Sequence, residues 1–148
     1  MYMNKKPGIL GLIYTAHQFL TELETNPKDY GTGEMLYSSE IHTITAVAEN
    51  PGCNLTQLAD HLGVSKAAVS KFVKKTINAG YICKKPSASN GKHVLFSATE
   101  KGKTAAAGHK KFEQEVFGPL RKIELSLPKK EAAVIRNFLL ELGKVIRK

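Results

Sequence analysis

Hydrophobic side chains recur at helical spacing through most of this 148-residue chain. In residues 5–25 the apolar positions are separated by three or four residues, which indicates an amphipathic helix. These positions are Ile9, Leu12, Ile13, Ala16, Phe19, Leu20 and Leu23. A second helix is expected to begin at Ser38, with this serine as its N-cap, and to end at the Asn-Pro-Gly signal of residues 50–52.

Two shorter helices joined by a glycine turn are predicted next. Asn54 can cap the first of them, with Gln57 completing a capping box, and Gly63 ends it. Ser65 can cap the second, which is rich in lysine and serine and stops at Gly80. Two helices joined in this way form a helix-turn-helix pattern.

The spacing of apolar residues then changes from helical to alternating. Residues 81–85 and 93–97 are typical of two short strands, and the polar loop between them contains the turn signal Asn90-Gly91. A β-hairpin directly after a helix-turn-helix makes the combination a winged helix. We therefore expect a mainly α fold with a small β-hairpin wing.

Longer helices are expected on both sides of this winged helix. One should start at Thr99 and run to about Phe117, with a break near Gly118 and Pro119, and the last should span residues 128–146. The terminal helices carry broad apolar stripes that a winged helix of this size cannot cover, which favours a second copy of the chain as partner. The alternative is that these helices pack only within one chain.

Composition limits the class of protein. A chain with 42% hydrophobic and 24% charged residues is ordinary for one folded soluble domain. No apolar stretch is long enough to cross a membrane and no signal-cleavage site is visible, so we expect a cytoplasmic protein without a membrane partner. The two cysteines, Cys53 and Cys83, lack the spacing of a disulfide framework or a metal motif. Without a glycine-rich phosphate loop, a catalytic triad or a paired-carboxylate pocket, no enzyme is expected.

The positive charge is concentrated in the predicted winged helix. The whole chain has a formal charge of +9, whereas residues 54–103 alone hold nine lysines against two acids, a balance of +7. Such an excess suits a polyanion, and nucleic acid is the commonest one for a protein of this size. The alternative is a basic face that serves only solubility.

The second helix of the pattern supplies the candidate DNA contacts. In a helix-turn-helix this element enters the major groove with its N-terminal residues toward base edges. The groove candidates are Ser65, Lys66, Ala67, Ser70 and Lys71, and the phosphate candidates are Lys74 and Lys75. Lysine lacks the guanidinium fork that reads guanine bidentately, so sequence specificity has no obvious source. For each lysine taken singly, the alternative is a solvated helix face.

The run LTQLADHLGVSKAAVSKFVKKTINAGYI, followed by a hairpin and LFSATEKGK, resembles the MarR family of bacterial transcription regulators. The resemblance implies a single domain over residues 1–148, with dimerisation helices at 5–37 and 118–148, a winged helix-turn-helix at 38–103 and a connecting helix at 99–117. It also implies a homodimer on double-stranded DNA with a near-palindromic operator. The family's wing usually carries Asp-x-Arg, where this chain has Asn90-Gly91-Lys92, so Asn90 and Lys92 are the wing's candidate contacts.

Most members of the family repress transcription until a small molecule, a metal or an oxidant binds. No required cofactor is expected here, and a small-molecule effector in the cleft beside the dimer interface, near Tyr14, His17 or Tyr37, is favoured over zinc. Zinc is the metal alternative. Its candidate ligands are His42, His109 and Glu113, with Glu24 or Glu34 as a fourth. Redox sensing is disfavoured, since neither cysteine lies in the first helix.

Together these patterns predict a homodimeric, sequence-specific DNA-binding transcription regulator, a repressor that an effector releases. Two alternatives stay open. One is a zinc-responsive regulator of the same fold. The other is a winged helix used for protein–protein assembly.

Overall fold

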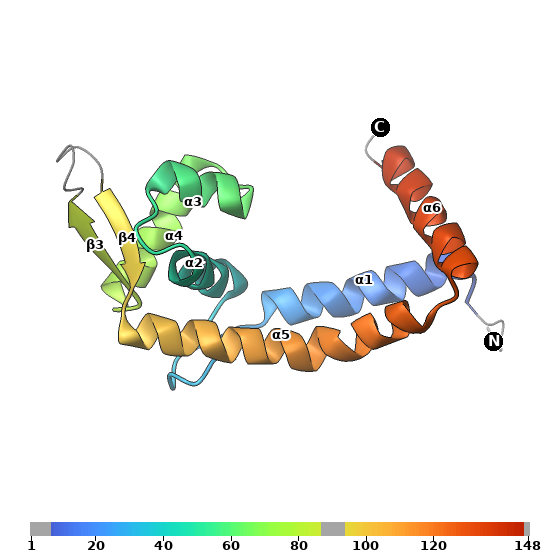
Figure 1. Ribbon diagram of the computed structural model, residues 1–148, viewed down its shortest axis with the longest axis horizontal. Helices are drawn as coiled ribbons and strands as arrows, with labels where there is room; N and C mark the ends of the chain where they lie inside the picture. The colour runs from blue at the N-terminus through green and yellow to red at the C-terminus, as the bar shows by residue number, and fades with distance from the viewer. Residues whose placement is uncertain (1–6, 87–93, 147–148) are drawn as a thin grey trace, which may run out of the picture. The chain divides into compact units, whose positions relative to one another are not determined.

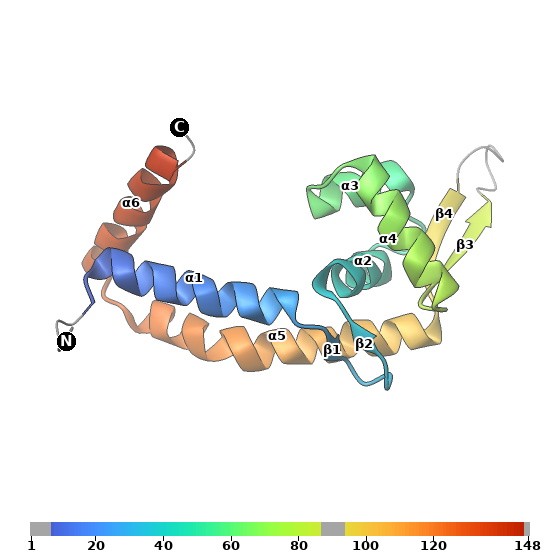
Figure 2. The ribbon, with the colours of Figure 1, turned by 180° about the vertical axis from the view of Figure 1, so that it is seen from behind.

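The computed structural model describes residues 7–86 and 94–146. Over these residues it is mainly helical with a small β-hairpin, which confirms the expected fold class (Figures 1 and 2). The helices are α1 (Ile9–Thr25), α2 (Ser38–Glu49), α3 (Leu55–Leu62), α4 (Lys66–Asn78), α5 (Glu100–Ser126) and α6 (Lys129–Ile146). The strands are β1 (Lys28–Asp29), β2 (Met35–Leu36), β3 (Ile82–Pro86) and β4 (Val94–Ala98).

The chain divides within α5 into two compact units, one ending at His109 and the other beginning at Lys110. In the first unit, α2 packs against α3, α4 and β4 (Figure 1). Its inner face consists of Ile41, Ile44 and Val47, each with no exposed surface. These side chains lie three residues apart, so they share one side of the helix and form the centre of the core.

The expected caps around the helix-turn-helix are confirmed. The Asn54 side chain accepts the N–H of Gln57 at 3.0 Å, and the Gln57 side chain accepts the N–H of Asn54 at 2.9 Å. Gly63 ends α3 with φ +65°, a left-handed conformation that a β-carbon would strain. The Ser65 hydroxyl then accepts the N–H of Ala68 at 3.2 Å and starts α4. The reciprocal bonding of Asn54 and Gln57 therefore fixes the start of α3. Gly63 and Ser65 fix the tight turn between the two helices.

The cap predicted for α2 is wrong. Ser38 is the first helical residue, and its hydroxyl bonds to the carbonyl of Glu24. The carboxylate of Glu40 instead accepts the N–H of Tyr37 at 2.8 Å. A glutamate at the third helical position is long enough to reach back to this donor, so the helix starts without a serine cap.

Strands β1 and β2 form a short antiparallel hairpin that the sequence pattern does not predict (Figure 2). One oxygen of Asp29 accepts the N–H groups of Gly31, Thr32 and Gly33 at 2.9 to 3.0 Å, which closes the turn. Both glycines have positive φ. Strands of two residues are too short to show alternation, so only the turn residues signal this hairpin.

The wing strands β3 and β4 are antiparallel, with Lys84 opposite Phe96, and each begins one residue later than expected. Phe96 also pairs with the chain before α3. Its N–H donates to the carbonyl of Cys53 and its carbonyl accepts the N–H of Gly52, both at 2.8 Å. These bonds join the wing to the helical core.

The predicted break in α5 is also wrong, because the helix continues through Gly118 and Pro119 to Ser126. A proline inside a helix removes one backbone hydrogen bond and crowds the preceding turn. Here the carbonyl left without a helical donor belongs to Glu115, an exposed residue whose backbone water can reach. Gly118 carries no β-carbon against the proline ring, which eases the clash.

Two glycines let α5 approach the rest of the first unit closely. A β-carbon at Gly102 would stand 2.1 Å from the carbonyl oxygen of Tyr81, and one at Gly108 would stand 2.1 Å from that of Tyr30. Both contacts are far inside van der Waals distance and involve backbone atoms. The helix therefore lies directly on the backbone of these two tyrosines.

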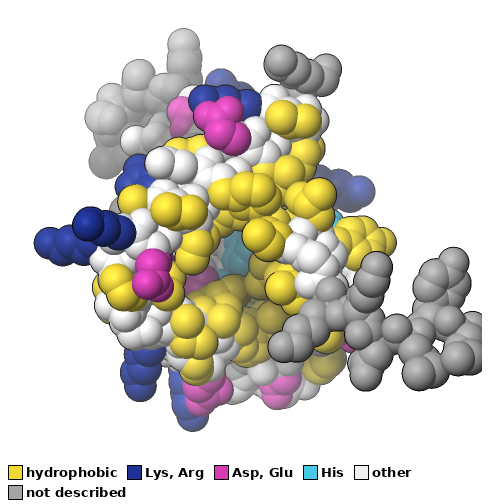
Figure 3. Space-filling model, turned by 90° about the vertical axis from the view of Figure 1, so that its right-hand side faces the viewer, with side chains coloured by type: hydrophobic (Ala, Val, Ile, Leu, Met, Phe, Trp, Pro, Cys, Tyr) yellow, Lys and Arg dark blue, Asp and Glu magenta, His cyan; other side chains and the backbone are white. Residues whose placement is uncertain are grey.

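Large apolar side chains remain exposed on α1 and in the second unit. Neither α1 nor α6 has a buried residue. The exposed side chains include Ile9, Leu12, Phe19, Phe117, Leu120, Ile123, Ile135, Phe138 and Leu139. Hydrophobic side chains are correspondingly abundant on the face drawn in Figure 3. Among the described residues, no helix has the length and apolarity needed to span a membrane.

The close approach at Gly102 predicts a large effect of a single methyl group. Gly102→Ala should lower the free energy of unfolding by about 2–3 kcal/mol, because overpacking against backbone outweighs the gain in helix propensity. Urea unfolding followed by circular dichroism measures this. The control is Lys110→Ala, an exposed position of the same helix, which should change the free energy by about 0.5 kcal/mol or less. Equal stability of the two variants would contradict the packing described.

Candidate nucleic-acid interface

The outward side of α4 carries most of the residues singled out from the sequence. Val69, Val73 and Thr76 are buried on the inner side of this helix. The opposite stripe is exposed and consists of Ala67, Ser70, Lys71, Lys74 and Asn78. Intervals of three, four and seven residues place these positions on one face of a helix. Ser65 caps the N-terminus and Lys66 flanks the stripe, both exposed.

No described carboxylate neutralises the lysines on this stripe or Lys66 beside it. Lys66, Lys71 and Lys74 make no salt bridge within the part of the chain that the structure describes. No acidic residue lies in α4 itself. The positive charge of this helix is therefore directed to solvent and available to an anion.

Lys75 differs from the other lysines of α4. Its Nζ lies 2.7 Å from an oxygen of Glu40, whose side chain is only 8% exposed, and 5.5 Å from the centre of the Tyr37 ring. This ion pair links α4 to the start of α2. The role of Lys75 at a phosphate stays a prediction. In the structure its ammonium forms an ion pair with Glu40 that joins two helices.

The wing adds two lysines that the sequence reading did not select. Lys84 and Lys85 of β3 are exposed and make no salt bridge among the described residues. Lys84 lines a cavity of about 590 Å³ together with Ser70, Lys74 and Asn78 of α4 and with Asn54, the N-cap of α3. The alternation of side chains along a strand was the signal that could have selected Lys84, because it places this side chain on the opposite face from those of its two neighbours.

The wing candidates Asn90 and Lys92 lie outside the described residues. The sequence-based expectation for them is therefore unchanged.

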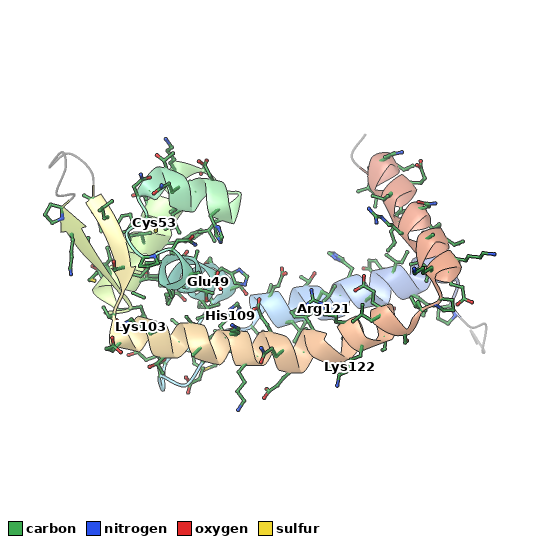
Figure 4. The ribbon with its side chains drawn as sticks, in the orientation of Figure 1. Glu49, Cys53, Lys103, His109, Arg121 and Lys122 are labelled. Carbon is green, nitrogen blue, oxygen red and sulfur yellow. The ribbon has the colours of Figure 1, made fainter. Side chains whose placement is uncertain are left out.

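The candidate metal ligands are only partly brought together. His109 lies on α5 (Figure 4). The centroid of its ring is 5.2 Å from that of the His42 ring on α2, edge to face. Nδ1 of His109 lies 3.4 Å from the hydroxyl of Thr45, and the Tyr30 ring packs 5.3 Å from the same imidazole. Glu113 follows one helical turn later on α5, in the second unit. Within the described residues, no group of three or more His, Cys, Asp or Glu side chains could hold a metal ion.

The aromatic residues considered for an effector are separated. Tyr14 and His17 line a shallow hollow of about 500 Å³ on α1. Tyr37 lies at the start of α2, beside Lys75. Only the first two can therefore contact the same small molecule in this hollow.

Cys53 is not an activated thiol. Cys53 is buried, and this burial raises the pKa of its thiol above the ordinary value. A raised pKa leaves less of the nucleophilic thiolate at neutral pH.

The winged-helix segment matches a known protein family. Residues 36–94 match the model of the MarR family. Among curated proteins, the chain is 31% identical over 94 residues to YhjH of Bacillus subtilis (strain 168), an uncharacterized HTH-type transcriptional regulator, covering 64% of this chain and 54% of the relative. YybA of the same organism, described in the same words, is 31% identical over 94 residues, with 64% and 59% covered. The chain thus spans about half the length of the curated relatives that it matches.

Solved structures with the same fold cover nearly the whole chain. ZitR of Lactococcus lactis, a zinc-responsive MarR family member, superposes with a TM-score of 0.70 at 23% identity over 91% of this chain and 99% of that chain. ZitR in complex with DNA gives a TM-score of 0.76 at 21% identity, with 95% and 99% covered. The transcriptional regulator SlyA gives 0.63 at 22% identity, with 95% and 94% covered. At these identities the likeness establishes the fold.

Proposed function

We propose that the chain is a member of the MarR family, whose model matches residues 36–94, and that it is a homodimeric transcription regulator that binds double-stranded DNA. The observation that carries the proposal is the exposed stripe on α4, with lysines that no carboxylate among the described residues neutralises. The fold's likeness to ZitR, which has been solved with DNA, supports it. The family's regulators also make a bacterial, cytoplasmic setting the natural one.

In the proposed complex α4 enters the major groove. Its N-terminal residues, Ser65, Lys66, Ala67 and Ser70, face base edges, and the small side chain of Ala67 allows close approach to a thymine methyl group. Lys71 lies in the groove, where its ammonium also neutralises a neighbouring phosphate, and Lys74 binds a phosphate. Lys84 and Lys85 extend the phosphate contacts along β3. Because lysine reads bases weakly, affinity depends mainly on the DNA backbone and specificity mainly on DNA shape.

A second copy of the chain is the proposed partner for the exposed apolar side chains. The surfaces of α1 and of the second unit display many large hydrophobic residues, more than a monomer ordinarily leaves in water. Two-fold pairing would bury them and present two copies of α4 to a near-palindromic operator.

We propose repression, relieved by a small organic effector, as the regulatory outcome. The hollow on α1 lined by Tyr14 and His17 is the proposed place for this effector, beside the surface assigned to the second copy. Most of the other residues that line this hollow are polar, so hydrogen bonds would fix the orientation of the effector and the Tyr14 ring would supply its apolar contact.

Zinc is the second candidate signal, because His42 and His109 lie side by side and the similar ZitR is zinc-responsive. The described residues fit a zinc site only in part, since zinc prefers four ligands in a tetrahedron and these two imidazoles supply two of them. If zinc is the signal, calorimetric titration of zinc into the wild-type protein gives saturable heat, which the His42→Ala/His109→Ala variant loses. Equal and weak heats from both proteins would remove zinc and leave the organic effector.

Salt dependence tests the DNA-binding proposal quantitatively. The wild-type protein first selects duplexes from genomic fragments, and fluorescence anisotropy then measures affinity for one selected duplex at increasing salt. Each phosphate contact contributes about 0.9 to the slope of log affinity against log salt. A dimer carries two copies of each lysine, so Lys71→Gln and Lys74→Gln should each reduce the slope by about 1.8.

The control for this measurement is Lys110→Gln, which removes the same charge from the second unit and should leave the slope unchanged. A wild-type protein that binds no fragment, or binds independently of salt, would contradict the proposal and favour a protein–protein assembly module.

A further inference from the structure

The turn between α4 and the wing is held by residues that lie far away in the sequence. Ala79, Gly80 and Tyr81 connect the last residue of α4 to the first of β3. Tyr81 has no exposed surface, and its backbone carbonyl accepts the N–H of Thr99 at 3.0 Å. The Thr99 hydroxyl also donates to the carbonyl of Gly80 at 2.7 Å. This junction therefore rests directly on the start of α5.

A second set of contacts reaches the same junction from the β1–β2 hairpin. The Tyr81 hydroxyl donates to Oε2 of Glu34 at 2.9 Å and lies 2.9 Å from the hydroxyl of Thr32. Lys101 lies between the two elements. Its Nζ donates to Oε1 of Glu34 at 2.7 Å and to the carbonyl of Ala79 at 2.9 Å. The same ammonium lies 4.3 Å from the centre of the Tyr81 ring, a favourable cation–π distance.

The charges of this cluster support each other. Hydrogen bonds from Lys101 and Tyr81 lower the pKa of the Glu34 carboxyl, and the bond to Glu34 raises the pKa of the Lys101 ammonium. Both shifts favour the ionised forms, so the pair stays charged at neutral pH. Solvent reaches both partners, with 34% of the Lys101 side chain and 51% of the Glu34 side chain exposed. An exposed ion pair of this kind contributes little to the free energy of unfolding. The importance of this pair lies in the backbone turn that it contacts.

The Glu34–Lys101 pair contacts the turn that sets the angle between α4 and β3, the two parts of the candidate interface. Lys74 lies shortly before the junction on α4, and Lys84 and Lys85 lie shortly after it on β3. Any change in the backbone at Ala79 or Tyr81 therefore changes the distance between these lysines. Phosphates on a DNA duplex have fixed spacing, so both groups can bind together only when this angle is maintained.

We infer that Glu34 and Lys101 are positioning residues for DNA binding, which act by bracing the junction between α4 and the wing. The inference rests on the proposed function. Neither residue belongs to the stripe of α4 or to the wing strands, and Glu34 carries the charge that repels DNA. The β1–β2 hairpin thereby becomes part of the DNA-binding machinery without contacting DNA.

The negative charge of Glu34 permits a test in which the sign of the effect decides. Removal of an acid from a DNA-binding protein should strengthen binding through electrostatics alone. In Glu34→Gln the neutral amide can still accept from Tyr81 but loses the ion pair with Lys101. Positioning therefore predicts weaker binding to the selected duplex, by about five- to tenfold.

A second ion pair at the start of α5 provides a matched control. Lys103 on α5 (Figure 4) has its Nζ 2.6 Å from Oε1 of Glu100 on the same helix. In the part of the chain that the structure describes, neither side chain bonds to the junction. Glu100→Gln makes the same change in charge and should bind equally well or more tightly. Lys101→Met should weaken binding more than Lys103→Met, although both remove one lysine. Lys101→Arg, which keeps a cation within reach of Glu34, should restore most of the affinity.

The outcomes separate the two proposals. If the wild-type protein binds no DNA, the proposed function fails. If the wild type binds and Glu34→Gln binds at least as tightly as Glu100→Gln, the positioning role is overturned. Circular dichroism confirms that each variant is folded at the assay temperature. Should Glu34→Gln be unfolded there, the comparison of Lys101→Met with Lys103→Met decides, and equal affinities overturn the inference.

Discussion

The contact between α5 and the backbone of Tyr81 is the constraint on which the candidate interface depends. Gly102 brings the helix so close that no side chain fits between, and Thr99 bonds to both carbonyls of the Gly80–Tyr81 turn. The end of α4 and the beginning of β3 are therefore held by one rigid element. A surface made of a helix and a strand can match a rigid polyanion only if the two keep their relative position, and this contact supplies that condition.

The electrostatics of the first unit follow a consistent division. Two lysines form ion pairs that join separate elements, Lys75 of α4 with Glu40 of α2 and Lys101 of α5 with Glu34 beside β2. Lysines on the outward stripe of α4 and on β3 have no such partner within the described residues. Paired charges brace the scaffold, whereas unpaired charges remain for a partner. The lack of arginine in residues 54–103 points to binding that depends on the DNA backbone more than on base identity.

The parts of the fold that could be predicted from sequence are those with local physical causes. The capping box of Asn54 and Gln57, the left-handed Gly63 and the serine cap of α4 are each encoded within a few residues. The errors arose where a local rule was overridden. Glu40 replaced the expected serine cap, and α5 passed through Pro119 because the strained turn is exposed to water.

The candidate site shows the same limit. The stripe on α4 was predictable from helical periodicity, since its residues recur at intervals of three and four. Contacts between distant segments were not. Nothing in the local sequence indicates that Glu34 hydrogen-bonds to Tyr81, or that the exposed Lys75 forms an ion pair with Glu40. These pairings depend on tertiary packing, as does the shared cavity of Lys74 and Lys84.

The central claim is that the unpaired lysines of α4 and β3 form one DNA-binding surface. Lysine reactivity tests it most directly, by brief acetylation with and without the selected duplex followed by mass spectrometry of the peptides. The account predicts that DNA protects Lys66, Lys71, Lys74, Lys84 and Lys85 while Lys110, Lys129 and Lys130 stay reactive. Protection spread evenly over both groups, or confined to the second, would contradict it.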